Sequence, residues 1–344
     1  MSAANFPLGT MKFLKGLLGR DIEEKPAAPA TMLPIEVPPL VFREGATLPI
    51  VDWEAMDRYA PPTVDRSALD VFWTTLARKW LEALGAALGK EYVVGDSERF
   101  LLLSPLDPRG ARVVLDVLER ARERISMVLE GIARETETGK VCVLVLDSED
   151  RYYDYISNYD APGEHSLSGG MFVQGGYGHF VFVASEVSTM EPTIAHELTH
   201  CLVQHLPLPA WLNEGIAVNT ENQLCPPGRP LYTPEEMHES HLKYWNETTI
   251  QEFWSGKSWS RPEANMLSYD MAKYFVLLAS EDYAAFRGFV NAADLADSGD
   301  TAARKHLGFP VANLAEAVLG EGPWAPRPEA WKDGIERGQF RIAQ

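Results

Sequence analysis

The chain has 344 residues, of which 46% are hydrophobic and 10% aromatic, and its formal net charge is −18 at pH 7. The apolar content is sufficient for a full core in one large or two modest domains. The acidity argues against a nucleic-acid partner, because phosphates would be repelled by such a chain. No apolar run approaches the roughly 18 residues of a membrane-spanning helix, so we expect no transmembrane segment.

The N-terminal region is rich in proline and shows little periodicity. Residues 11–20 form a short basic and apolar segment, too interrupted for a signal peptide, that could make weak peripheral contact with a membrane surface. We predict that residues 1–50 are a disordered or extended arm. A helical lead-in packed on the core should follow over residues 51–95, because residues 68–88 carry an apolar stripe at helical spacing.

Residues 96–206 alternate apolar strands with helices, which fits a mixed sheet covered by helices. The predicted strands are residues 100–103, 141–146 and 179–184, and the predicted helices are residues 110–133 and 148–159. The glycine-rich segment Gly163–Gly178 contains no Lys and precedes a strand rather than a helix. It is therefore predicted to be a hairpin and not a phosphate-binding loop.

The segment His196-Glu197-Leu198-Thr199-His200 contains the pattern HExxH. Two histidines four residues apart lie on one face of a helix, so both imidazoles can reach a single metal ion. Glu197 points to the neighbouring side, where it can hold a water molecule and act as the general base. The capping box Ser188–Glu191 predicts the start of this helix. His205 is expected on its core side, as a structural residue and not a ligand.

A second segment, Trp211-Leu212-Asn213-Glu214-Gly215-Ile216-Ala217, supplies Glu214 as the third ligand. Two histidines and one carboxylate leave the fourth position of Zn²⁺ open, as in catalytic sites. Among residues that could hold a ligand histidine, Val218 is unsuitable, whereas Asn219 and Glu221 are candidates. The chain then continues into predominantly helical sequence.

Three cysteines, Cys142, Cys201 and Cys225, do not form a disulfide framework. We interpret them as free thiols in a reducing compartment and predict a cytoplasmic protein. On a predicted helix that starts at Pro234, His238 and His241 are three residues apart. They are interpreted as part of a solvated face, because no further ligand motif lies near them.

The two motif segments resemble those of the gluzincin zinc metallopeptidases. WLNEG-x-A is similar to the zinc-glutamate motif of aminopeptidase N-like enzymes, and the short gap before Glu214 resembles the bacterial peptidase MA-like group. The resemblance covers residues 99–222 and extends more weakly to residue 320. It implies an α+β, zincin-like fold with a small mixed β-sheet, an edge strand and the HExxH helix. A mainly helical C-terminal part over residues 207–325 and a tail over residues 326–344 follow.

The resemblance also implies two features of the site. Residues 179–184 should be the edge strand that pairs with the substrate backbone. A Tyr or His after the zinc Glu should stabilise the oxyanion, and we choose Tyr269, on a predicted helix over residues 265–280, with Tyr274 and His241 as alternatives.

The predicted function is a zinc-dependent metallopeptidase that hydrolyses bonds in a peptide or protein substrate. The chain lacks a Gly-x-Met-x-Asn motif before the HExxH helix, which argues against an aminopeptidase. Two alternatives stay open: a zincin-like binding or assembly module with little or no turnover, and a non-peptidase zinc hydrolase. The sequence does not indicate an oligomeric state.

Overall fold

A computed structural model describes residues 37–61, 65–135, 138–159, 170–173, 176–228 and 230–331. The chain divides into two units, Met1–Ile35 and Glu36–Gln344, and every described residue belongs to the second. Most of the predicted N-terminal arm, including residues 11–20, lies outside the described residues, as do residues 332–344 of the predicted tail. Within the described part of the chain, no helix is long and apolar enough to cross a membrane.

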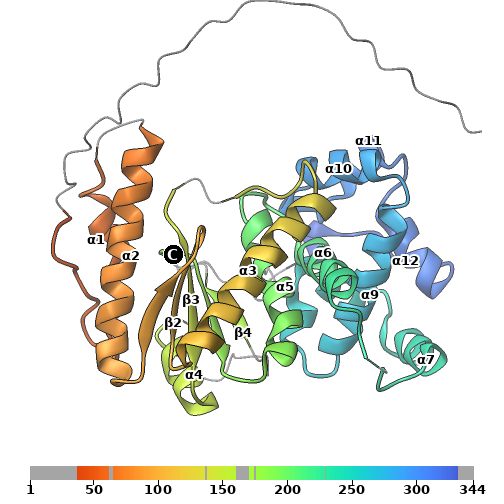
Figure 1. Ribbon diagram of the computed structural model, residues 1–344. Coiled ribbons are helices and arrows are strands. Elements are labelled where there is room, and N and C mark those ends of the chain that lie inside the picture. Colours follow the sequence, from red (N-terminus) through yellow and green to blue (C-terminus); the bar gives the residue numbers. More distant parts are fainter. Residues whose placement is uncertain are drawn as a thin grey trace, which may run out of the picture. The chain divides into compact units, whose positions relative to one another are not determined.

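A five-stranded mixed sheet with the order β1-β2-β3-β5-β4 forms the centre of the N-terminal half (Figure 1). The strands are β1 (Val93–Asp96), β2 (Phe100–Ser104), β3 (Val141–Leu146), β4 (Gly170–Val173) and β5 (His179–Val183). β2, β3 and β5 are parallel, whereas β1 and β4 run antiparallel to their neighbours at the two ends of the sheet. The parallel strands are buried on both faces, which explains their continuous apolar sequences.

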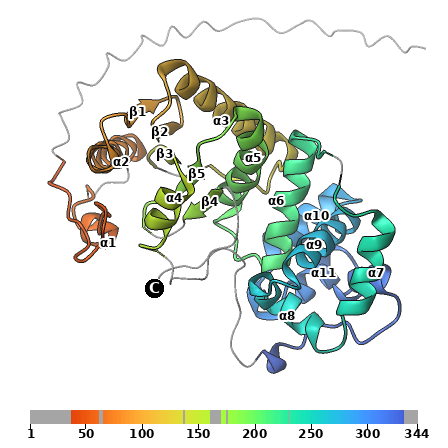
Figure 2. The same ribbon diagram turned by 90° about the horizontal axis from the view of Figure 1, so that it is seen from below.

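Helices cover both faces of this sheet (Figure 2). They are α2 (Arg66–Leu88) and α4 (Glu149–Ile156) on one face, and α3 (Pro108–Val128) and α5 (Val187–Val203) on the other. Alternation along β5 separates the two layers, because His179 contacts α2 and α4 whereas Phe180 and Phe182 join the core beneath α3 and α5. The short helix α1 (Trp53–Asp57) precedes α2.

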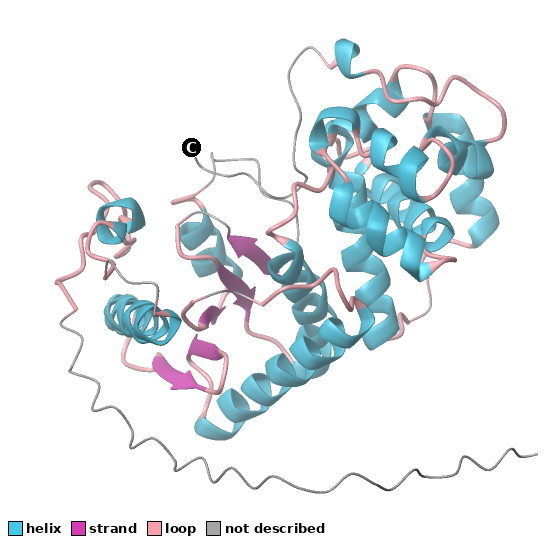
Figure 3. Cartoon of the chain, turned by 90° about the horizontal axis from the view of Figure 1, so that it is seen from above, coloured by secondary structure: helices cyan, strands magenta, loops and turns pink. Residues whose placement is uncertain are grey.

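The C-terminal part is helical in all its described regular elements, as the colouring by secondary structure shows (Figure 3). Its α-helices are α6 (Ala210–Leu224), α7 (Pro234–Tyr244), α8 (Thr249–Ser255), α9 (Asn265–Ala279), α10 (Tyr283–Ala292), α11 (Asp300–His306) and α12 (Ala312–Leu319). α6 packs against both α5 and α9, so it joins the two halves. Trp211 of α6 is fully buried and donates from its indole N–H to the carbonyl of Ser298 at 3.1 Å. A mixed sheet followed by a mainly helical part is the α+β arrangement that the sequence predicted.

The sheet order shows that the edge-strand prediction was wrong. β5 pairs with β3 on one side and with β4 on the other, so residues 179–184 lie inside the sheet. The edge strand next to β5 is β4, which lies within the glycine-rich segment that was predicted only as a hairpin. A Cβ at Gly170 would lie 2.3 Å from the Phe182 ring, so glycine is needed there for close packing. The strand was not predicted because the glycine-rich composition of this segment is typical of turns.

The boundaries of α5 also differ from the prediction. The helix begins at Val187 after Glu186, and no side chain caps it, so the predicted capping box at Ser188–Glu191 lies inside the helix. The helix ends at Val203, and His205 therefore lies beyond it and is exposed, not on its core side. The three cysteines are free, as predicted, with Cys142 and Cys201 buried and Cys225 half-buried.

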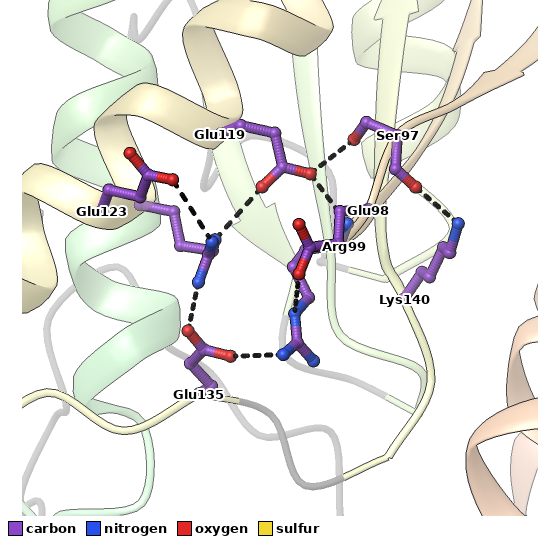
Figure 4. Close-up of polar contacts among 8 residues, drawn as sticks. Ser97, Glu98, Arg99, Glu119, Glu123, Glu135 and Lys140 are labelled. Carbon is purple, nitrogen blue, oxygen red and sulfur yellow. Dashed lines mark hydrogen bonds and ion pairs between the residues drawn. The ribbon is translucent and has the colours of Figure 1, made fainter. Parts of the chain in front are cut away.

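A polar network joins α3 to the turn between β1 and β2 (Figure 4). The carboxylate of Glu119 accepts hydrogen bonds from the Ser97 hydroxyl at 2.7 Å and from the backbone N–H of Arg99 at 2.8 Å. The Arg122 guanidinium contacts the same carboxylate at 3.2 Å and also pairs with Glu135. These contacts fix the outer end of the sheet relative to the helix layer that carries the candidate site.

Candidate metal centre

Helices α5 and α6 bring together the three residues predicted as metal ligands. One ligand atom from each of His196, His200 and Glu214 lies within 4.8 Å of the others. His200 and Glu214 are buried and His196 is half-buried. The histidines come from successive turns of α5, and Glu214 comes from the first half of α6, which packs directly on α5.

The distances within this group fit a metal ion better than a set of hydrogen bonds. The Glu214 Oε2 atom lies 3.4 Å from Nε2 of His196 and 3.5 Å from Nε2 of His200. Ligand atoms about 2.0–2.1 Å from a tetrahedral zinc ion are separated by about 3.3–3.4 Å. Glu214 is fully buried, and neither carboxylate oxygen has a hydrogen-bond partner among the described residues. A buried carboxylate in this condition is costly unless a cation satisfies it.

Each histidine is oriented by a polar partner on its other ring nitrogen. Nδ1 of His196 lies 3.0 Å from Oε2 of Glu221, and Nδ1 of His200 lies 3.1 Å from Oδ1 of Asn213. An Nδ1–H donated to these oxygens leaves Nε2 to face Glu214 as a ligand atom.

One of these partners was anticipated and one was missed. Glu221 was one of the two residues proposed to hold a histidine, whereas Asn219 instead donates to the carbonyls of Gly215 and Lys273. Asn213 was not anticipated, although its place beside Glu214 in the motif was a usable signal.

The charges of the group are strongly coupled. Burial alone would lower the pKa of His196, but the carboxylates of Glu214 and Glu221 outweigh burial and raise that pKa to about 10. Burial would likewise raise the pKa of Glu214, but His200 and His196 lower it to about 2. These two shifts favour a protonated His196 beside an ionised Glu214. A divalent cation would compete with that proton.

Glu197 follows His196, one of the three candidate ligands, in α5 and contacts the edge strand β4. Its side chain is 4% exposed, and Oε2 accepts a hydrogen bond from the backbone N–H of Phe172 in β4 at 2.9 Å. Burial raises the pKa of Glu197, although His196 and His200 oppose this shift. A carboxylate with a raised pKa, fixed beside the ligands, is suited to accept and return a proton.

Tyr269 of α9 is the oxyanion candidate that lies beside a ligand. Its ring centroid is 6.4 Å from that of His196. Burial and the charges of Glu214 and Glu197 raise the pKa of Tyr269 well above its usual value, so the hydroxyl keeps its proton and can donate.

The other candidates have different surroundings. Tyr274 is 39% exposed, and its ring lies against the Lys273 ammonium. His241 is buried, so its assignment to a solvated face was wrong: its Nε2 lies 3.0 Å from Oδ2 of Asp270, and its Nδ1 accepts from the Trp245 indole. His238 is exposed, and neither it nor His241 belongs to the ligand group found among the described residues.

No protein-family model matches the chain, and no curated protein matches it.

Proposed function

We propose that the protein is a zinc-dependent metallopeptidase that uses His196, His200 and Glu214 as metal ligands and Glu197 as the general base. The observation that carries this proposal is the buried carboxylate of Glu214, which has no hydrogen-bond partner among the described residues and lies between two imidazole Nε2 atoms. Two histidines and one carboxylate are a ligand set that leaves a zinc position open for chemistry.

The metal and two side chains would have separate roles in hydrolysis. Zinc bound at these ligands would supply Lewis acidity toward a carbonyl oxygen and lower the pKa of water. Glu197 would take a proton from the attacking water and deliver it to the leaving amine. Tyr269 would donate its hydroxyl hydrogen to the developing oxyanion, because its raised pKa keeps that hydrogen in place.

The substrate class is inferred from the strand beside Glu197. β4 ends the sheet and packs on α5, and the backbone N–H of Phe172 reaches the carboxylate of the proposed base. An extended peptide running beside this strand would bring its carbonyl groups past Glu197 and the ligands. The sequence predicted that residues 179–184 pair with the substrate backbone. We propose β4 for that pairing instead.

Metal content and cleavage of a peptide library test the proposal together. Purified wild-type protein should hold about one zinc per chain. Glu197→Gln should keep zinc and lose hydrolysis by about a hundredfold or more, because general-base catalysis contributes about 10²–10⁴. His196→Ala and Glu214→Ala should lose both zinc and activity, whereas the control His238→Ala should keep both.

Other outcomes would contradict the ligand assignment or favour one of the two alternative functions. Stoichiometric zinc in His196→Ala and Glu214→Ala would remove the ligand assignment. Stoichiometric zinc with no cleavage of any peptide would favour a binding or assembly module. Hydrolysis of small amides or esters without cleavage of peptides would favour a non-peptidase zinc hydrolase.

A further inference from the structure

A pocket of about 490 Å³ lies at the C-terminal end of α5, and its lining does not include the three metal ligands. Its walls come from segments far apart in the sequence: α1, α2, the start of β3, the turn between β4 and β5, and the end of α5.

Three aromatic side chains, Trp53, Trp73 and Tyr177, form much of the pocket wall. The ring centroids of Trp53 and Tyr177 are 5.0 Å apart, and those of Trp73 and Tyr177 are 6.5 Å apart. Gly176 has a φ of +70°, and a Cβ there would lie 2.3 Å from the Trp53 ring. The Tyr177 hydroxyl donates to the carbonyl of Lys140 at 2.6 Å. These contacts hold the aromatic rings in place before any ligand arrives.

The charge of the pocket is negative. Glu54 and Asp57 of α1 line it and are exposed, and neither carboxylate has an ion pair or hydrogen bond among the described residues. Lys140 also lines the pocket, but its ammonium contacts Asp96 at 3.2 Å and the Ser97 carbonyl. Aromatic rings together with carboxylates that lack a partner among the described residues favour a cation in this pocket, through cation–π and charge attraction.

The pocket continues the face of α5 that carries Glu197. Glu197, Cys201 and Gln204 follow one another at helical spacing, and the last two line the pocket. Gln204 is about 10 Å from Glu197 along the helix axis at a rise of 1.5 Å per residue. An extended peptide covers that distance in about three residues.

Phe172 of β4 contacts both Glu197 and the wall of the pocket. Its backbone N–H holds Glu197, and a Cβ added to Gly178, in the pocket wall, would lie 2.9 Å from its ring.

We propose that this pocket is a subsite for the cationic side chain of a lysine or arginine, about three residues from the bond that is cleaved. The place of that residue in a substrate rests on the proposed peptidase function. Binding of an ammonium or guanidinium group rests only on the pocket's rings and carboxylates.

Binding is measured first, without turnover. N-acetyl-lysine methylamide and its uncharged counterpart N-acetyl-norleucine methylamide are titrated into the full chain by calorimetry. The lysine probe should bind at least tenfold more tightly. Glu54→Gln/Asp57→Asn should remove that difference, whereas Asp116→Asn/Glu239→Gln, which removes two exposed charges elsewhere, should retain it. Equal binding of the two probes, or equal loss in both double variants, would overturn the proposal.

A second titration distinguishes binding of a peptide substrate from binding of a free amine. A peptide with one lysine and the free diamine cadaverine are titrated into Glu197→Gln, and the peptide should bind at least tenfold more tightly. Cadaverine binding as tightly as the peptide overturns the substrate subsite.

In wild type, lysine peptides should have a KM at least tenfold below that of norleucine peptides. The Glu54→Gln/Asp57→Asn variant should raise the lysine KM to the norleucine value at unchanged kcat. A lysine KM that does not respond to this variant contradicts the subsite. If wild type cleaves no peptide, the proposed function fails, and the two binding assays still decide the pocket.

Discussion

Glu221 and Asn213 orient the two histidines of the candidate metal centre by contacting their Nδ1 atoms. Such partners fix which ring nitrogen is free and raise its basicity toward a metal. Glu221 also raises the pKa of His196, so its carboxylate would influence both the protonated ring and a ring bound to a metal. The three candidate ligands and these two partners all come from α5 and α6.

Replacing Glu221 should weaken the metal site without removing a ligand. Glu221→Ala should raise the Kd for zinc by about 10–100-fold, because loss of such a partner frees the His196 ring. A competition titration with a chromophoric chelator measures this Kd, and Glu239→Gln on α7 is the control for loss of one exposed carboxylate. An unchanged Kd in Glu221→Ala would show that α5 and α6 alone fix the ring.

Gly215 explains how α6 can approach α9 so closely. A Cβ at this position would lie 2.5 Å from the carbonyl oxygen of Ala272 and 2.7 Å from a methyl group of Val276. The first contact is with backbone, which cannot move aside by changing a rotamer. The glycine after Glu214 is therefore required by the packing of two helices that carry a proposed ligand and Tyr269.

Gly215→Ala should destabilise the fold although alanine is the better helix former by about 1 kcal/mol. Overpacking against a fixed carbonyl costs about 1–3 kcal/mol, and the net loss should appear in urea unfolding. Zinc affinity should fall as well, because α6 must shift and Glu214 moves with it. Gly228→Ala is the control, since a Cβ there meets nothing within 4 Å. Equal stability of Gly215→Ala and wild type would contradict the close approach.

The network around Glu119 makes a prediction about the outer end of the sheet. Glu119→Ala removes the acceptor of Ser97, Arg99 and Arg122, and it should lower the free energy of unfolding by about 1–3 kcal/mol. Glu123 on the same helix is a matched control, because its side chain is 65% exposed and its contact with Arg122 is 3.9 Å long. Glu123→Ala should stay within about 0.5 kcal/mol of wild type in the same urea titration. Similar losses in both variants would refute a special role for Glu119.

The two faces of the sheet have different chemistry. The face under α5 leads to the proposed metal centre, whereas the face under α2 and α4 holds a neutral histidine. His179 is fully buried, with its ring nitrogens 2.7 Å from the Tyr155 hydroxyl and 2.7 Å from the Tyr177 carbonyl. Burial lowers the pKa of His179 to about 4, against the opposing effect of the Tyr177 carbonyl.

This histidine should make stability depend on pH in a defined window. Above pH 6.5 His179 is neutral in the folded and unfolded chains and contributes no slope. Between pH 6.5 and 4 the unfolded chain binds the proton and the folded chain does not. The free energy of unfolding therefore decreases as the pH is lowered, by about 3 kcal/mol over the whole window. Urea unfolding of wild type and His179→Gln at pH 7 and pH 5 measures the difference. Parallel pH profiles for the two proteins would exclude this origin.

Several features of the protein were determined by its sequence alone. Apolar periodicity predicted α2, α3 and the parallel strands β2, β3 and β5, because burial on one face or both imposes a local pattern. The HExxH spacing predicted that His196 and His200 share a helix face, and the second motif identified Glu214, which does join them. These inferences depend on residues near one another in the chain or on ligand chemistry.

Features that depend on distant segments became visible only in the packed fold. Strand order is a matter of long-range pairing, so local pattern could not show that β4 and not β5 ends the sheet. His205 became exposed because α5 ends at Val203, and Asn213 became a partner of His200 because α6 packs on α5. The pocket beyond Glu197 depends in the same way on α1, α2 and the β4–β5 turn meeting α5. The chemistry of a residue follows from the local sequence, whereas its neighbours across the fold are set by the packing of whole elements.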